Sequence, residues 1–254
     1  MKETFYNYDF PLKICLLADI HNRPYDEISR SLRRQQPDII AVAGDFLYTY
    51  APTDDTPVMS RTRYSLDFLA DCAKHAPTFV SLGNHEWMLS DKDKEIIAGT
   101  GVKLLDNTWT QFNGVFIGAL TSSGVSAYTE FRKGKQQVYP KWQHFNAPQR
   151  NEPVIGWLDE FEKQSGKKLL LCHHPEYRDK YLKDKKIDLI LSGHAHGGQI
   201  RLFGRGLYAP GQGLFPRYTS GVHENMIISR GLANTAGFIP RLFNPREIVY
   251  IVPN

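Results

Sequence analysis

The sequence predicts a layered α/β fold, in which helices cover β-sheets. Through the first half of the chain, apolar runs of strand length, such as residues 39–43, alternate with segments of helical spacing, such as 25–36. This alternation favours an α/β architecture. The chain of 254 residues is long enough to bury one substantial core. Its longest apolar runs are far shorter than the roughly 20 residues of a membrane-spanning helix.

The first half contains three predicted strands and three predicted helices. In order they are strand 12–18, helix 25–36, strand 39–43, helix 64–74, strand 78–82 and helix 91–98. Pro37 and Asp38 mark the end of the first helix. The strands are short continuous apolar runs, which are typical of buried strands.

The middle of the chain changes to successive strands. These are 102–107, 110–112 and 115–120, and the turn-forming pair Asn113-Gly114 separates the last two. A helix at 154–164 and strands at 168–172, 188–192, 225–229 and 248–252 complete the predicted elements. Because the chain shows no internal repeat and no low-complexity linker, we predict a single domain, 1–254.

Composition restricts the class of protein. Hydrophobic residues make up 41% and charged residues 23%, as in soluble globular proteins. The net charge of +4 permits anionic substrates but is weaker than the basic face of a dedicated nucleic-acid binder. Cys15, Cys72 and Cys172 are too widely spaced for a disulfide framework and are expected to be buried. Residues 1–10 lack a secretory pattern, so we expect a cytoplasmic protein.

Five blocks of metal-binding side chains follow the predicted strands. They are Asp19-Ile20-His21, Gly44-Asp45, Gly83-Asn84-His85-Glu86, His173-His174-Pro175 and Gly193-His194-Ala195-His196-Gly197-Gly198-Gln199. In layered sheets, sites collect at the carboxyl ends of the strands, so the five blocks are expected to converge on one cleft.

Taken singly, four blocks have ordinary structural explanations. Asp19 and His21 fit a strand-end loop, Asp45 fits a turn, and Asn84 fits a helix N-cap. The two imidazoles of the last block, at alternate positions between glycines, are more specific. Nitrogen and oxygen ligands without thiolates suit divalent Mn, Zn or Fe. Since the ligands outnumber those of one tetrahedral ion, we expect two metal ions.

The order of the blocks from Asp19 to His196 resembles the calcineurin-like metallophosphoesterase superfamily. Residues 193–199, with Ser229-Arg230-Gly231 and Asn244-Pro245-Arg246-Glu247, further resemble a bacterial branch of membrane-associated or cell-wall phosphodiesterases. The resemblance implies a four-layer sandwich of two mixed β-sheets flanked by helices. It also implies a dinuclear phosphoesterase that works by metal-activated hydroxide attack, with phosphodiesters favoured over phosphomonoesters.

The resemblance assigns a role to each site residue. It implies that one ion is bound by Asp19, His21 and His196, and the other by Asn84, His173 and His194, with Asp45 bridging both. His173 is preferred to His174 because the family's ligand is the first histidine after the strand. His85 is the implied catalytic residue, which stabilises the transition state or protonates the leaving group.

One position departs from the family pattern. Many members have an aspartate three residues after the Gly-Asp aspartate, where it orients the catalytic histidine, and here that position is Tyr48. Either Tyr48 acts differently, or another carboxylate, such as Asp54 or Glu86, assists His85.

Two segments are candidates for substrate contact. Residues 121–150 carry five basic residues against one acid, with interleaved aromatics, and fit a substrate-facing cap or a solvated surface segment equally well. Residues 201–218, also basic and aromatic, are expected to line the cleft. The expected substrate is a phosphorylated small molecule or lipid, with peripheral contact to anionic membranes as a weaker hypothesis. The alternatives are a nuclease, a cyclic-nucleotide phosphodiesterase or a non-catalytic metal-binding scaffold.

Overall fold

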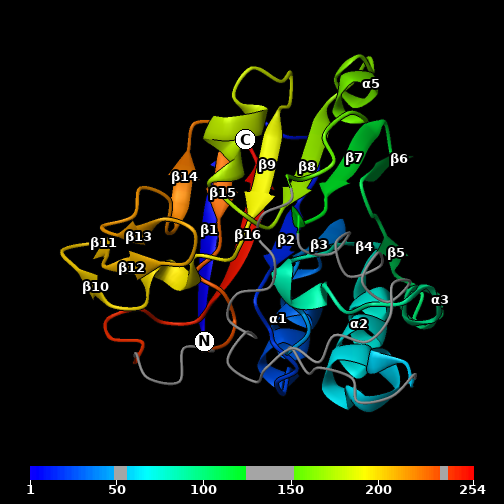
Figure 1. Ribbon diagram of the computed structural model, residues 1–254, viewed down its shortest axis with the longest axis horizontal. Helices are drawn as coiled ribbons and strands as arrows, with labels where there is room; N and C mark the ends of the chain where they lie inside the picture. The colour runs from blue at the N-terminus through cyan, green and yellow to red at the C-terminus, as the bar shows by residue number, and fades with distance from the viewer. Residues whose placement is uncertain (49–55, 124–151, 235–239) are drawn as a thin grey trace.

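Two six-stranded β-sheets pack face to face in a computed structural model of the chain, with helices on the outer faces (Figure 1). The structure describes residues 1–48, 56–123, 152–234 and 240–254. The predicted four-layer arrangement of mixed sheets and helices is confirmed. The predicted cap at 121–150 lies outside the described residues from position 124 onward.

The first sheet has the strand order β1-β16-β2-β3-β4-β5. Its strands are β1 (Lys2–Tyr8), β16 (Glu247–Pro253), β2 (Ile14–Leu17), β3 (Ile39–Ala43), β4 (Thr78–Ser81) and β5 (Lys103–Leu104). From β2 to β5 the strands run parallel, whereas β16 is antiparallel to β2 and parallel to β1. The carboxyl ends of β2, β3 and β4 therefore lie at the same edge.

The second sheet has the order β14-β15-β9-β8-β7-β6. Its strands are β14 (Gly221–His223), β15 (Met226–Ile228), β9 (Leu189–Ser192), β8 (Lys168–Cys172), β7 (Val115–Leu120) and β6 (Thr108–Phe112). The four central strands are parallel, and β14 and β6 are antiparallel edge strands. Asn113 and Gly114 both have positive φ in the β6–β7 turn, as the sequence predicted.

The two faces of the first sheet contribute to two separate hydrophobic cores. Ile14, Leu16 and Ile39 of the first sheet meet Leu169 and Leu189 of the second in a core between the sheets. The opposite face of the first sheet packs on three helices. These are α1 (Asp26–Gln35), α2 (Arg63–His75) and α3 (Asp91–Ala98). Burial on both faces explains why these strands are continuous apolar runs.

The outer face of the second sheet carries less regular structure. A short helix, α5 (Leu158–Glu162), and a π-helical turn, η4 (Arg178–Leu182), pack there. The helix predicted at 154–164 is therefore too long, because Gly156 disfavours helix at its start.

The three cysteines are free and buried, as expected. Among the described residues, no helix has the length and apolar character to span a membrane.

Small elements follow the last metal-binding block. The 3-10 turn η5 (His196–Gly198) leads into two hairpins, β10 (Arg201–Leu202) with β11 (Arg205–Gly206) and β12 (Tyr208–Ala209) with β13 (Gly213–Leu214). Figure 1 shows both hairpins projecting together from the side of the molecule away from α2 and α3.

Candidate metal centre

The five predicted blocks meet at one end of the two packed sheets. They follow β2, β3 and β4 in the first sheet and β8 and β9 in the second. Among the described residues, four groups of three side chains bring their ligand atoms within 4.8 Å of one another, and two of these groups contain only predicted metal ligands. The first group is Asp19, His21 and His196, and the second is Asp45, His173 and His194.

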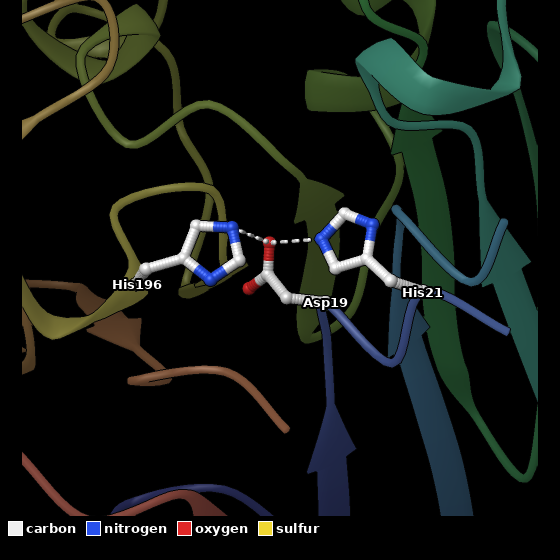
Figure 2. A group of neighbouring side chains, drawn as sticks. All are labelled: Asp19, His21 and His196. Carbon is white, nitrogen blue, oxygen red and sulfur yellow. Dashed lines mark ion pairs between the residues drawn. The ribbon is translucent and has the colours of Figure 1, made fainter. Parts of the chain in front are cut away.

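The first group centres on the carboxylate of Asp19. Asp19 Oδ1 lies 3.5 Å from His196 Nε2 and 3.9 Å from His21 Nε2, with both imidazoles turned towards it (Figure 2). Two ligand atoms that each lie about 2.1 Å from a common ion are roughly 3–3.5 Å apart. The ligand atoms of the first group are therefore spaced nearly as closely as ligands that bind one common metal ion.

Asp45 lies between the two groups. Its Oδ2 is 3.0 Å from His173 Nε2 in the second group and 3.8 Å from His21 Nε2 in the first. His85, in the 3-10 turn η2 (Asn84–Glu86) after β4, donates its backbone N–H to Asp45 Oδ1 at 2.9 Å. The geometry gives one carboxylate access to both groups, as a bridging ligand requires.

The imidazoles are oriented by their second ring nitrogen. His21 Nδ1 contacts the Leu47 carbonyl at 3.0 Å, and His173 Nδ1 contacts the Ala43 carbonyl at 2.7 Å. These contacts direct each Nε2 into the centre, an arrangement common among metal-binding histidines.

Several buried atoms of the predicted ligands have no hydrogen-bond partner. Within the described residues, His21 Nε2, His194 Nε2 and Asn84 Oδ1 are buried without a hydrogen bond. A buried polar atom without a partner costs about 1–3 kcal/mol. Divalent cations coordinated by these atoms would remove that cost, so the donor set fits bound metal ions.

The protonation states of His21, His194 and Asp45 suit metal binding. Burial and the neighbouring His85 lower the pKa of His21 well below its usual value. Burial, with His174 and His173 nearby, does the same to the pKa of His194. Burial raises the pKa of Asp45, but the imidazoles of His173 and His85 outweigh it and hold the pKa well below the usual range. Neutral imidazoles and an ionised carboxylate are the forms that bind metals.

Backbone strain is concentrated at the centre. Five of the seven predicted ligands have positive φ, namely Asp19 (57°), His21 (49°), Asp45 (54°), His194 (65°) and His196 (45°). This conformation is uncommon outside glycine and costs about 1–3 kcal/mol per residue. Such strain clusters at functional sites, where the surrounding structure holds it in place.

Two glycines allow the loops to approach closely. A Cβ on Gly83 would collide with Asp45 Oδ1, and a Cβ on Gly193 would lie 2.8 Å from Asp19 Oδ2. Both positions directly precede predicted ligand residues. A side chain at either one would displace a carboxylate from the centre.

Glu86 holds the Asp45 loop in place. Its carboxylate accepts hydrogen bonds from the backbone N–H groups of Asp45 (2.8 Å), Leu47 (2.9 Å) and Gly83 (2.7 Å). Burial and the charge of Asp45 raise the pKa of Glu86 to about 8. These contacts identify Glu86 as a loop-positioning residue.

His85 lies nearer the surface than the ligands. Its side chain is 23% exposed, against 2% or less for Asp45 and His21, and its Nε2 is 3.8 Å from Asp45 Oδ2. Burial nevertheless lowers its pKa, against the opposing charge of Asp45. The Tyr48 ring lies 6.2 Å from the His85 ring, centroid to centroid. Asp54, the other carboxylate considered as a partner of His85, lies outside the described residues.

The adjacent histidines His173 and His174 face different neighbours. His173 faces Asp45, whereas His174 contacts Glu176 through Nδ1 at 3.0 Å and stacks on Tyr177. His174 and Glu176 also form a third group of candidate ligands with His194. It shares His194 with the second group, and a fourth group consists of His21, Asp45 and His85.

Asn244 and Gly231, near the end of the chain, hold the metal-binding loops in position. The sequence did not predict this role for them. The Asn244 side-chain amide donates to the carbonyls of His196 (2.7 Å) and Gln199 (3.0 Å). Gly231 packs directly against Asp19, where its Cβ would lie 2.9 Å from Asp19 Oδ2. Both residues belong to the motifs that gave the resemblance to the bacterial branch.

Residues 12–198 match the sequence profile of the family described as calcineurin-like phosphoesterase. The chain belongs to this family. It is therefore a metallophosphoesterase, a hydrolase that acts on phosphoester bonds with divalent metal ions.

Bacterial relatives support the assignment. The chain is 27% identical over 229 residues to YpbG of Bacillus subtilis, covering 89% of this chain and 74% of YpbG. It is 28% identical over 207 residues to phosphodiesterase YaeI of Escherichia coli, covering 76% and 63%. It is also 28% identical over 250 residues to the metallophosphoesterase Cj0846 of Campylobacter jejuni, covering 94% and 58%. The match thus spans less than two thirds of the lengths of YaeI and Cj0846.

Proposed function

We propose that the protein is a phosphodiesterase with a dinuclear metal centre. Asp19, His21 and His196 hold one divalent cation, and Asn84, His173 and His194 hold the other. The observation that carries the proposal is the position of Asp45, within 4 Å of an imidazole of each group. One carboxylate between two ligand groups is the arrangement that a bridging ligand needs.

The bound cations would neutralise phosphoryl oxygens and lower the pKa of coordinated water. The protein orients the donors through Leu47 and Ala43, and it excludes bulk water by burying them. His85 is the more exposed polar group next to Asp45, so it is placed to meet the substrate. We assign His85 to a hydrogen bond with a phosphoryl oxygen or to protonation of the leaving alkoxide.

A phosphodiester of a small molecule or lipid is the proposed substrate. The Escherichia coli relative YaeI is named a phosphodiesterase, which supports this choice. The net charge of +4 makes a nucleic-acid substrate less favoured. Imidazole and carboxylate donors without thiolates suit Mn, Zn or Fe as the cations.

The test is an assay of bis-p-nitrophenyl phosphate and p-nitrophenyl phosphate with added Mn²⁺, Zn²⁺ or Fe²⁺. Asp45→Asn should lower kcat/KM for the diester by about 100-fold or more, because it weakens both metal positions at once. The matched control is Asp67→Asn on α2, which changes a half-exposed carboxylate paired with Arg63 and should leave turnover intact. Full turnover in Asp45→Asn contradicts the bridging role, and a clear preference for the monoester contradicts the phosphodiesterase assignment.

A further inference from the structure

Three Leu-Phe pairs lie on exposed segments beside the metal centre, two of them in the β10–β11 and β12–β13 hairpins. They are Leu202-Phe203, Leu214-Phe215 and Leu242-Phe243. All six side chains are exposed, from 45% for Leu242 to 80% for Phe243 and full exposure for Phe203. Single exposed apolar residues are common, but a group of six large ones marks an interaction surface.

The three phenylalanines share a strained backbone. Phe203, Phe215 and Phe243 have φ values of 50°, 52° and 54°. Positive φ is unfavourable for a bulky side chain and is better tolerated by asparagine or glycine. The fold therefore gains neither burial nor a relaxed backbone from phenylalanine at these positions.

The three pairs form one face. Arg201 donates its backbone N–H to the Leu242 carbonyl at 3.0 Å, which joins the first pair to the third. A pocket of about 450 Å³ is lined by Phe203 and Phe243 together. A second pocket, of about 490 Å³, lies between Gly204 of the β10–β11 turn and Phe215. We call this surface the Leu-Phe face, and its two hairpins project from one side of the molecule in Figure 1.

The Leu-Phe face is cationic as well as apolar. Residues 199–218 and 240–246 contain five arginines and no aspartate, glutamate or lysine, although Arg217 pairs with Asp179 and Arg246 with Glu27. Arg205, Arg217 and His223 line the larger pocket. Arg205 is exposed and forms no ion pair within the described residues. Apolar rings among cationic side chains complement a surface that offers acyl chains and phosphates together.

We propose that the Leu-Phe face docks on the surface of an anionic phospholipid bilayer. The phenylalanine rings enter the boundary between headgroups and acyl chains, and the exposed guanidinium of Arg205 contacts a lipid phosphate. The face is joined to the metal centre, because Arg201 donates to the Gly197 carbonyl at 2.8 Å and Asn244 donates to the His196 carbonyl. Docking therefore holds the metal centre close to the membrane. This inference does not depend on the reaction proposed above.

The test is co-sedimentation of the full chain with sucrose-loaded vesicles. One set is phosphatidylcholine alone, and the other is equal parts phosphatidylcholine and phosphatidylglycerol. The wild type should bind the anionic vesicles, and binding should weaken as salt is raised. The triple variant Phe203→Asn/Phe215→Asn/Phe243→Asn should bind about 100-fold more weakly, because three rings no longer leave water. Arg205→Gln should lower binding about fivefold.

The controls separate binding from folding and from catalysis. Asparagine tolerates positive φ, so the triple variant should melt at or above the wild-type temperature. Tyr64→Ala/Val154→Ala removes two exposed apolar side chains elsewhere on the surface and should bind as the wild type does. Asp45→Asn should also bind fully, whatever its activity.

Three outcomes overturn the inference. The first is wild-type protein that stays in solution with the anionic vesicles, and the second is a triple variant that binds as the wild type does. The third is a wild-type dimer in solution that the triple variant dissociates, without binding to vesicles. That outcome would assign the Leu-Phe face to a second copy of the chain.

Discussion

In the proposed dinuclear centre, the His173 imidazole can carry a proton or bind a metal ion. Burial lowers its pKa, but the carboxylates of Asp45 and Asp19 outweigh this and raise the pKa to about 10 in the metal-free protein. The imidazole is therefore protonated at neutral pH until a cation arrives. Coordination through Nε2 requires the neutral ring, so the cation must displace that proton.

Metal binding is accordingly expected to release about one proton from His173 near pH 7.5. Lower pH favours the imidazolium, so metal affinity should fall as pH decreases and rise towards pH 10. Calorimetric titration of the metal-free protein with Mn²⁺, in buffers of different ionisation enthalpy, measures the released protons. An observed enthalpy that does not change with the buffer contradicts this expectation.

His85 is expected to act on the substrate and not on metal retention. Its side chain lies nearer the surface than the buried donors, beside Asp45. His85→Ala should lower kcat by about 100-fold to 10,000-fold while the metal content stays at the wild-type level. His75→Gln, which alters a histidine of α2, is the matched control and should leave kcat unchanged. Full activity in His85→Ala rules out the assigned role, and loss of metal would make His85 a ligand.

At the level of secondary-structure elements, Asn244, in the segment just before β16, supports the loop that carries His194 and His196. The Asn244 amide donates to two carbonyls of that loop, and Gly197 packs against the same side chain. Outer groups of this kind typically change metal affinity by about 10-fold to 100-fold.

Asn244→Ala should weaken binding of one metal ion more than the other, because His196 is the predicted ligand whose own carbonyl accepts from Asn244. Metal titration monitored by activity should then show one affinity lowered about 10-fold to 100-fold. Asn254→Ala, at the exposed C-terminus, is the matched control. If Asn244→Ala binds both metal ions with the wild-type affinities, Asn244 does not support the metal centre.

How well an element can be predicted from sequence depends on its burial. The apolar runs 39–43, 115–120 and 168–172 form β3, β7 and β8 with the predicted boundaries, because both faces of these strands are buried. β1 was not predicted, because this edge strand (Lys2–Tyr8) is partly exposed and lacks an apolar run. The two-residue strands of the hairpins are too short to show a period.

In the candidate site, too, only some of the residues could be predicted from the sequence. Metal-binding side chains are recognisable from their chemistry and their place after strands, so the positions of His173 and His194 were predictable. Positioning residues depend on contacts between distant segments. Asn244 reaches a carbonyl 48 residues away, and Glu86 reaches a backbone N–H 41 residues away. No local pattern indicates such contacts.

At the scale of the whole molecule, the site depends on how the two sheets pack. Parallel β2, β3 and β4 bring three ligand loops to one edge, and parallel β8 and β9 bring two more to the facing edge. Asp45 from the first sheet and His173 from the second meet at 3.0 Å across this junction. The metal centre is therefore a product of the sandwich and not of either sheet alone.

Metal content per chain tests the central claim most directly. Wild-type protein loaded with Mn²⁺ and dialysed should contain about two ions per chain by plasma mass spectrometry, as a two-metal site requires. Asp45→Asn, prepared in the same way, should retain about one ion or fewer, because it weakens both positions. Wild-type protein with a single ion, or Asp45→Asn with two, would contradict a dinuclear centre bridged by Asp45.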